Sequence, residues 1–101
     1  MGGVTLEYPE RMPMSEYLTT YTIRNCHDDF LQVIIEPWAE EFTIATGVAL
    51  SIKIFGDRKG EFETEVGPRT LTMWLWGGCR AQVFLDGSDK TPPSLSIAAP
   101  C

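Results

Sequence analysis

Apolar and polar residues alternate with a period of two along most of this 101-residue chain. The clearest case has four aliphatic residues separated by other side chains: Val48, Leu50, Ile52 and Ile54. Because successive side chains of a strand point to opposite faces, this pattern predicts a strand with one buried face. The same alternation, rich in β-branched and aromatic residues, predicts strands at 18–24, 38–44, 62–66, 70–76 and 80–86, and a weaker one at 4–8.

The segment Phe30–Ile35 is apolar on nearly both faces, which predicts a central strand covered on two sides. Turn signals recur about every 8–12 residues, and no window has a sustained 3.6-residue period. We therefore predict an all-β chain: one small antiparallel β-sandwich or barrel-like domain of about seven to eight strands, spanning 1–101. Residues 1–17 are expected to be partly irregular, and 88–101 to form a tail with a short strand at 94–98.

The glycines at 77 and 78 predict a hairpin between the strands at 70–76 and 80–86. A three-residue loop, 77–79, places the aliphatic residues of both strands on one face, because a one-residue slip would turn every side chain over. On the opposite face this register gathers three aromatic residues: Trp74, Trp76 and Phe84. Large exposed aromatic patches are rare on monomers, so the same face predicts a homodimer with these residues near its centre.

The chain has a single histidine, His27. This excludes zinc and iron sites that need two or three histidines, and any triad would have to use His27 itself. The run His27, Asp28 and Asp29 is the weak candidate for a metal site, with a polar turn as the favoured interpretation. No catalytic residue and no cofactor are predicted, and the sequence favours a non-enzymatic role.

Three glutamates, Glu61, Glu63 and Glu65, fall on one face of a predicted strand. Paired carboxylates can serve as acid and base, but a solvated face, paired across to Lys53 or Arg80, is the favoured interpretation. A further tryptophan, Trp38, follows Glu36-Pro37 and is expected to anchor the core, with a binding role as the alternative.

The formal net charge is −6, and all of it belongs to the first 47 residues, where eight acidic residues face two basic ones. This balance argues against nucleic-acid binding and for an acidic patch that steers a basic protein partner. The chain lacks a basic signal-peptide start and a long apolar run, so no membrane contact is expected. Three irregularly spaced cysteines are typical of a reducing compartment, which predicts a cytoplasmic protein.

The stretch from Asn25 through Ile35-Glu36-Pro37-Trp38-Ala39-Glu40-Glu41-Phe42 to Gly47, followed by alternating strands up to Asp86-Gly87, resembles a pattern found in short, uncharacterised bacterial proteins. The resemblance covers about residues 22–87 and rests mainly on the Glu-Pro-Trp segment. It implies a small β domain of bacterial origin and carries over no catalytic residue. We also hypothesise a gene carried on a mobile cassette.

Three functions remain open at this point. The first is a non-catalytic β domain that acts through protein–protein contacts as a homo-oligomer. The second is an immunity-type inhibitor that covers a basic partner with its acidic first half. The third is a small-molecule-binding domain in which Trp74, Trp76 and Phe84 line a cleft.

Overall fold

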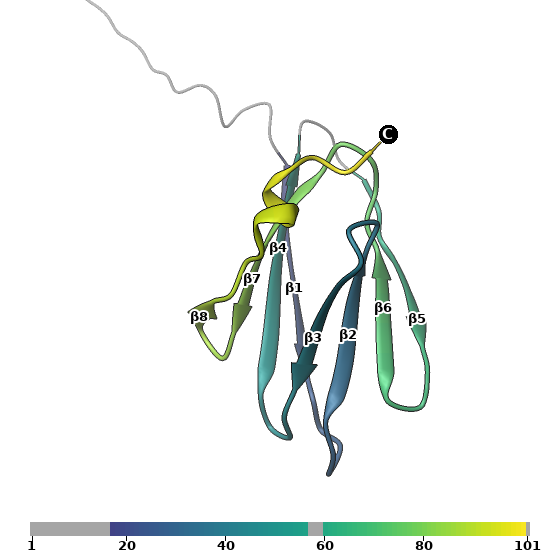
Figure 1. Ribbon diagram of the computed structural model, residues 1–101, viewed down its shortest axis with the longest axis vertical. Helices are drawn as coiled ribbons and strands as arrows, with labels where there is room; N and C mark the ends of the chain where they lie inside the picture. Colours follow the sequence, from purple (N-terminus) through teal and green to yellow (C-terminus); the bar gives the residue numbers. More distant parts are fainter. Residues whose placement is uncertain (1–16, 57–59, 101) are drawn as a thin grey trace, which may run out of the picture.

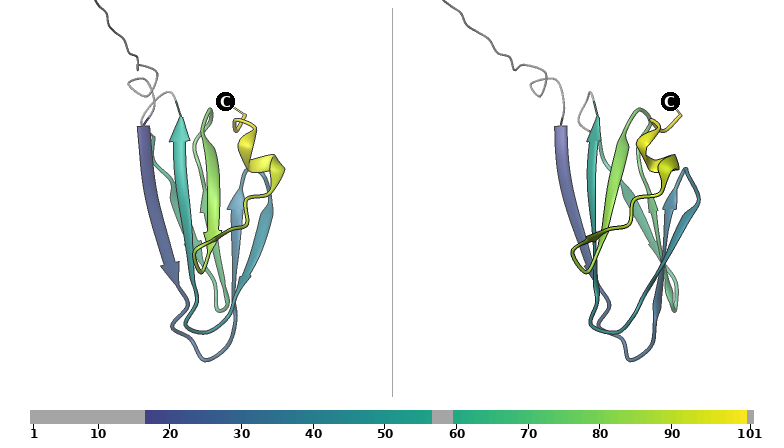
Figure 2. Two further views of the ribbon diagram at one scale, coloured as in Figure 1. Left: turned by 90° about the vertical axis from the view of Figure 1, so that its left-hand side faces the viewer. Right: turned by 60° about the vertical axis from the view of Figure 1, so that its left-hand side comes forward.

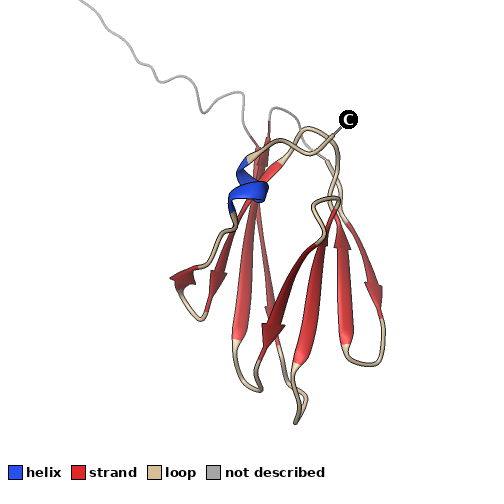
Figure 3. Cartoon of the chain, viewed as in Figure 1, coloured by secondary structure: helices blue, strands red, loops and turns tan. Residues whose placement is uncertain are grey.

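The computed structural model describes residues 17–56 and 60–100. Within these residues, eight strands and one 3₁₀ turn follow one another (Figures 1 and 3). The elements are β1 (Tyr17–Arg24), β2 (Leu31–Glu36), β3 (Glu40–Ile44), β4 (Ala49–Gly56), β5 (Glu63–Val66), β6 (Thr70–Trp74), β7 (Arg80–Leu85), β8 (Ser88–Asp89) and η3 (Pro93–Ser96). The bounds of β1 to β7 lie within two residues of the predicted strands, because the local alternation marks where a pleated, half-buried segment begins and ends. The short β8 falls in the segment predicted as a tail.

The strands form two four-stranded sheets that pack as two layers (Figure 2). Sheet I has the order β1-β4-β7-β8, and sheet II has the order β3-β2-β6-β5. The sheets do not close on each other, so of the two predicted architectures the sandwich is the one present. All pairs are antiparallel except β2 with β6, which run parallel.

The core lies between the inward faces of the two sheets and is almost entirely aliphatic. Sheet I contributes Leu50, Ile52, Ile54, Ala81 and Val83, and sheet II contributes Val33, Ile35, Ile44 and Met73. The predicted inward residues of these strands are therefore the buried ones. Burial of these aliphatic side chains is the main force that holds the two sheets together.

The predicted hairpin between β6 and β7 is wrong, because the two strands belong to different sheets. Gly78 takes the expected positive φ of 87°, but the turn carries the chain from one layer to the other. Both strands pair with other partners: β6 pairs with β2 and β5, and β7 pairs with β4 and β8. The true hairpin turn of this region is Asp86-Gly87, where both residues have positive φ, as a tight two-residue loop requires.

The strand at Phe30–Ile35 is central in sheet II, between β3 and β6, but it is not covered on both sides. Phe30 is exposed, and Ile34 lies half-buried on the outer face. The prediction of a doubly covered strand fails because the described residues build two layers, with no third layer over sheet II.

The C-terminal segment is a packed element rather than a strand and a tail. The predicted strand at 94–98 is replaced by η3, in which Leu95 is completely buried. Beyond η3, Ala99 accepts a backbone hydrogen bond from Gly78 (2.9 Å) and donates one to Cys79 (2.8 Å). The segment crosses the upper end of the sandwich and so closes it (Figure 1). The predictions for 1–16, including the strand at 4–8, fall outside the described residues.

Among the described residues, no helix is long and apolar enough to cross a membrane.

Candidate functional surface: the outer face of sheet II

Trp74 is the last residue of β6 and points away from the core, with 47% of its surface exposed. The strand register places Glu36 of β2 beside it on one side and Glu63 of β5 on the other. Residues that pair across neighbouring strands share a face and lie about 5 Å apart. The indole is therefore set between two carboxylates on an open sheet surface.

The next row of the same face carries more acidic residues. Glu41 of β3 lies across from Ile34, and Glu65 of β5 lies across from Thr72. Glu41 accepts a hydrogen bond from the Gln32 side chain. We call the outward set Glu36, Glu41, Glu63, Glu65 and Trp74 the acidic face. The four strands of sheet II hold five glutamates and neither lysine nor arginine.

The outer face of sheet I has the opposite character. Its four strands carry three basic residues, Arg24, Lys53 and Arg80, and a single acidic one, Asp89. The Lys53 ammonium lies 5.2 Å from the centre of the Phe84 ring, and the Arg80 guanidinium lies 4.7 Å from that of Phe55. Both are cation–π pairs, which keep these two basic side chains against the surface of the sheet.

Within the described strands, acidic and basic residues are thus divided between the two sheets. The acidic face takes Glu36 and Glu41 from the first half of the chain and Glu63 and Glu65 from the second. The suggested pairing of the β5 glutamates with Lys53 or Arg80 does not occur, since those bases lie on the other sheet. The sequence pattern placed Glu63 and Glu65 on one strand face correctly, whereas Glu61 lies before β5 begins. The pattern could not show which strands would flank them.

The aromatic residues predicted to form one patch are separated. Trp74 lies on the outer face of sheet II, and Phe84 lies on the outer face of sheet I. The prediction of a shared face for Trp74, Trp76 and Phe84 is wrong, because it assumed that β6 and β7 were neighbours. An interface role for any one of them remains a prediction.

Trp76 is half-buried against the core rather than displayed. Its ring lies on Gly60, where an added methyl carbon would come within 2.3 Å of the indole. Its buried Nε1 has no hydrogen-bond partner among the described residues. Trp76 therefore belongs to the packing of the connection between β6 and β7.

Trp38 anchors the C-terminal segment. It is half-buried against the core in the β2–β3 turn, where the Glu36–Pro37 peptide is cis, and its Nε1 donates a 3.0 Å hydrogen bond to the carbonyl of Ile97. Close by, the hydroxyl of Ser94 donates to the carboxylate of Glu40. These contacts agree with the interpretation of Trp38 as an anchor.

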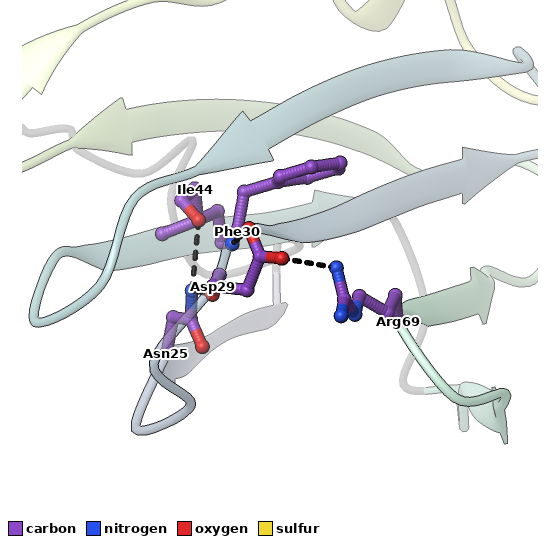
Figure 4. Close-up of polar contacts among 5 residues, drawn as sticks. All are labelled: Asn25, Asp29, Phe30, Ile44 and Arg69. Atoms are coloured by element: carbon purple, nitrogen blue, oxygen red, sulfur yellow. Dashed lines mark hydrogen bonds and ion pairs between the residues drawn. The ribbon is translucent and has the colours of Figure 1, made fainter.

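The loop with His27, Asp28 and Asp29 is organised by hydrogen bonds (Figure 4). Asp29 accepts a bond from the backbone of Phe30 (2.7 Å) and forms an ion pair with Arg69. The Phe30 amide, with help from the Arg69 guanidinium, lowers the pKa of the Asp29 carboxyl. No group of three or more potential metal ligands is gathered among the described residues, and His27 and Asp28 are exposed to solvent.

Asn25, just before this run, organises the loop. It is completely buried, and its Nδ2 donates to the carbonyls of Asp29 (2.8 Å) and Ile44 (2.9 Å). Its Oδ1 accepts from the backbone of His27 (2.9 Å). Asparagine next to a strand end is a signal for such a turn, but its burial depends on β3 lying beside it.

The described cysteines differ in environment. Cys26 is exposed, whereas Cys79 is buried and its thiol donates to the carbonyl of Trp76 (2.9 Å). Burial raises the pKa of the Cys79 thiol, so the sulfur stays protonated and unreactive. Both thiols are free.

Comparison with known proteins finds no matching family model, no matching curated protein and no matching solved structure. The resemblance to short bacterial proteins therefore stays a prediction.

Proposed function

We propose that this chain is a non-catalytic β domain that binds a basic protein partner on its acidic face. The observation that supports this is the setting of Trp74 between Glu36 and Glu63, on a sheet whose strands hold no basic residue. A solvated strand face usually mixes charges of both signs, and an exposed tryptophan on it is uncommon.

The chemistry of this surface suits arginine and lysine side chains. A guanidinium that stacks on the indole gains a cation–π interaction and can reach the carboxylates on either side. Tryptophan is enriched among the residues that dominate binding energy at protein interfaces. The surrounding glutamates would also speed encounter with a positively charged surface.

An immunity-type inhibitor that covers a basic enzyme or toxin is one form of this function. A small-molecule cleft lined by Trp74, Trp76 and Phe84 is disfavoured, since the three residues lie on different sides of the fold. The acidic face would repel a phosphate backbone, which also disfavours nucleic acid as its ligand.

A hexa-arginine peptide is a suitable probe for this surface. The chain has three tryptophans, so an amide-correlation spectrum of the labelled protein contains three indole signals. At low salt we expect the Trp74 signal to shift on titration. The Trp38 and Trp76 signals should stay in place, because Trp38 Nε1 donates to the Ile97 carbonyl and Trp76 Nε1 is buried away from the peptide.

Two double variants with the same change of net charge test the location. Glu63→Gln with Glu65→Gln should weaken peptide binding about tenfold, since each exposed ion pair contributes up to about 1 kcal/mol. Asp28→Asn with Asp86→Asn removes two exposed carboxylates elsewhere and should have little effect. Equal weakening by both pairs, or no shift of Trp74 at low salt, would refute the proposal.

A further inference from the structure

The two sheets have four edge strands, and three of them carry features that discourage pairing with another chain. In sheet II, β5 bears Glu63 and Glu65, and β3 is short and begins with Glu40 and Glu41. In sheet I, β8 is only two residues long. Short strands and charged side chains are the usual protections of a sheet edge.

The fourth edge, β1, has no such protection. It is eight residues long, its sequence YLTTYTIR contains no proline, and its only charge is Arg24 at the end. Among the described residues it pairs with β4 alone. Leu18 on its outer face is 64% exposed. A long edge that is rich in β-branched residues and charged only at its end is a template for strand addition.

The backbone of β1 has a defined set of unpaired groups. Asn25 donates to the carbonyl of Val48 (3.1 Å), and Asp86 donates to the carbonyl of Ala49 (2.9 Å). Backbone groups along a strand point alternately to its two neighbours, so the even residues of β4 face β1 and the odd residues face β7. In the β1–β4 register, the odd residues of β1 then bond to β4. The N–H and C=O groups that point outward belong to Leu18, Thr20, Thr22 and Arg24.

The two sides of the sandwich are also unequal. The C-terminal segment joins to sheet II through its contacts with Trp38 and Glu40. On the β1 side, the ring of Tyr21 meets that of Phe62, just before β5, at 4.8 Å between centroids. The β1 edge thus borders the side of the sandwich away from the C-terminal segment (Figure 2).

We propose that two copies of this chain pair through β1, antiparallel and about a two-fold axis, to make one continuous eight-stranded sheet from both copies of sheet I. The strand is self-complementary in this arrangement. One register uses all four outward residues: Leu18 then lies opposite Arg24, and Thr20 lies opposite Thr22. No like charges face each other, and both members of the threonine pair favour strand conformation.

A second copy fits this edge better than an unrelated strand, because the same eight residues supply both halves of a symmetric ladder. In sheet II, the glutamates of the edge strand β5 disfavour a similar pairing of β5 with β5 of a second copy. A two-fold axis normal to the sheet would also leave both acidic faces on one side of the dimer. A partner protein could then engage both at once, although the dimer itself does not depend on the proposed function.

Two proline variants on different edges test this interface. Thr20→Pro removes an outward N–H of β1 without removing a bond to β4. By the same alternation the outward residues of β3 include Thr43, because Gln32 of β2 bonds toward β6. Thr43→Pro is therefore a matched control on an edge that should stay free.

In light scattering after size exclusion, the wild-type protein and Thr43→Pro should have twice the mass of the chain. Thr20→Pro should have the mass of a single chain and keep the circular dichroism of a folded β protein, with dimer affinity reduced more than about a hundredfold. A monomeric wild type, or a dimeric Thr20→Pro, would overturn the proposal.

Hydrogen exchange in the wild-type protein gives a second measurement that does not require a variant. The amides of Leu18, Thr20, Thr22 and Arg24 should be protected, and their protection should fall on dilution, while the Thr43 amide exchanges freely. Protection that does not change with concentration would mean that another part of the same chain covers β1. That result, or rapid exchange of all four amides at high concentration, refutes the dimer.

Discussion

At the scale of single residues, the polar side chains that matter most are those that close loops. Asn25 satisfies the carbonyls of Asp29 and Ile44 and the amide of His27 from one buried position. It thereby ties the end of β1 to the end of β3, which belongs to the other sheet. Buried polar groups carry a large cost when a partner is removed, because the remaining group has lost its water.

Replacing Asn25 by alanine should lower the free energy of unfolding by about 2–3 kcal/mol, since two carbonyls lose their donor. Cys26→Ala, at the exposed neighbouring position, should stay within about 0.5 kcal/mol of the wild type. Urea unfolding followed by tryptophan fluorescence measures both. Equal stability of Asn25→Ala and the wild type would show that the buried amide is not needed.

The lowered pKa of Asp29 predicts that acid reduces the stability of the folded chain. Its pKa lies below the ordinary 3.8 in the folded chain, because of the Phe30 amide and then Arg69. As the pH falls below about that ordinary value, the unfolded chain binds the proton first, so folding stability that is complete at neutral pH is lost. Asp29→Asn should therefore lose less stability than the wild type between neutral pH and strong acid. Thermal unfolding across that range decides it, and identical profiles would contradict the assignment.

At the scale of elements, the C-terminal segment covers the core at one end of the sandwich. It has no strand period, and it packs through two small anchors, Leu95 and Ala99. It is joined to the body by the Trp38–Ile97 bond and by the backbone bonds of Ala99. The segment is therefore an integral part of the fold.

Leu95→Ala should destabilise the protein by roughly 2–5 kcal/mol, the usual cost of emptying a fully buried leucine site. Ile97→Ala, two residues further along and 68% exposed, should change stability by less than about 0.5 kcal/mol. The Ile97 carbonyl that binds Trp38 is kept in both variants. If denaturant titration gives the two variants the same midpoint, the segment is not part of the cooperative unit.

At the scale of the whole molecule, the two layers of the sandwich have different electrostatic surfaces. Sheet II has glutamates on either side of Trp74 on its outer face, whereas Lys53 and Arg80 of sheet I lie over phenylalanine rings. Carboxylates gathered on one face repel one another, and salt screens that repulsion between exposed groups. The repulsion within the acidic face therefore lowers the free energy of unfolding. Binding of a basic partner is a reason for this face to be acidic.

Added sodium chloride should raise the thermal unfolding midpoint of the wild-type protein. Glu63→Gln with Glu65→Gln should start from a higher midpoint at low salt and respond less to added salt, because part of the repulsion is gone. Differential scanning calorimetry at fixed protein concentration compares the two. A salt response of equal size in both proteins would place the repulsion elsewhere.

Most strand positions, and the inward faces of the strands that form the core, could be predicted because the relevant signal is local. The exception among the predicted faces is β5, whose four residues are all exposed. The alternation from Val48 to Phe55, for example, places Leu50, Ile52 and Ile54 in the core whatever strand lies beside them. Turn residues such as Asp86-Gly87 are local in the same way, since their positive φ values depend on two residues. These features needed no knowledge of the rest of the chain.

Strand pairing was a different matter, because it depends on contacts between residues far apart in sequence. The same letters permit β6 to pair with β7 in a hairpin or with β2 in parallel, and both choices bury Met73. Tertiary packing selected the second. Sequence alone thus determined that Trp74 points outward, but only the assembled sheets decided that its neighbours are Glu36 and Glu63 rather than Phe84, because alternation specifies a side chain's face and not the strand beside it.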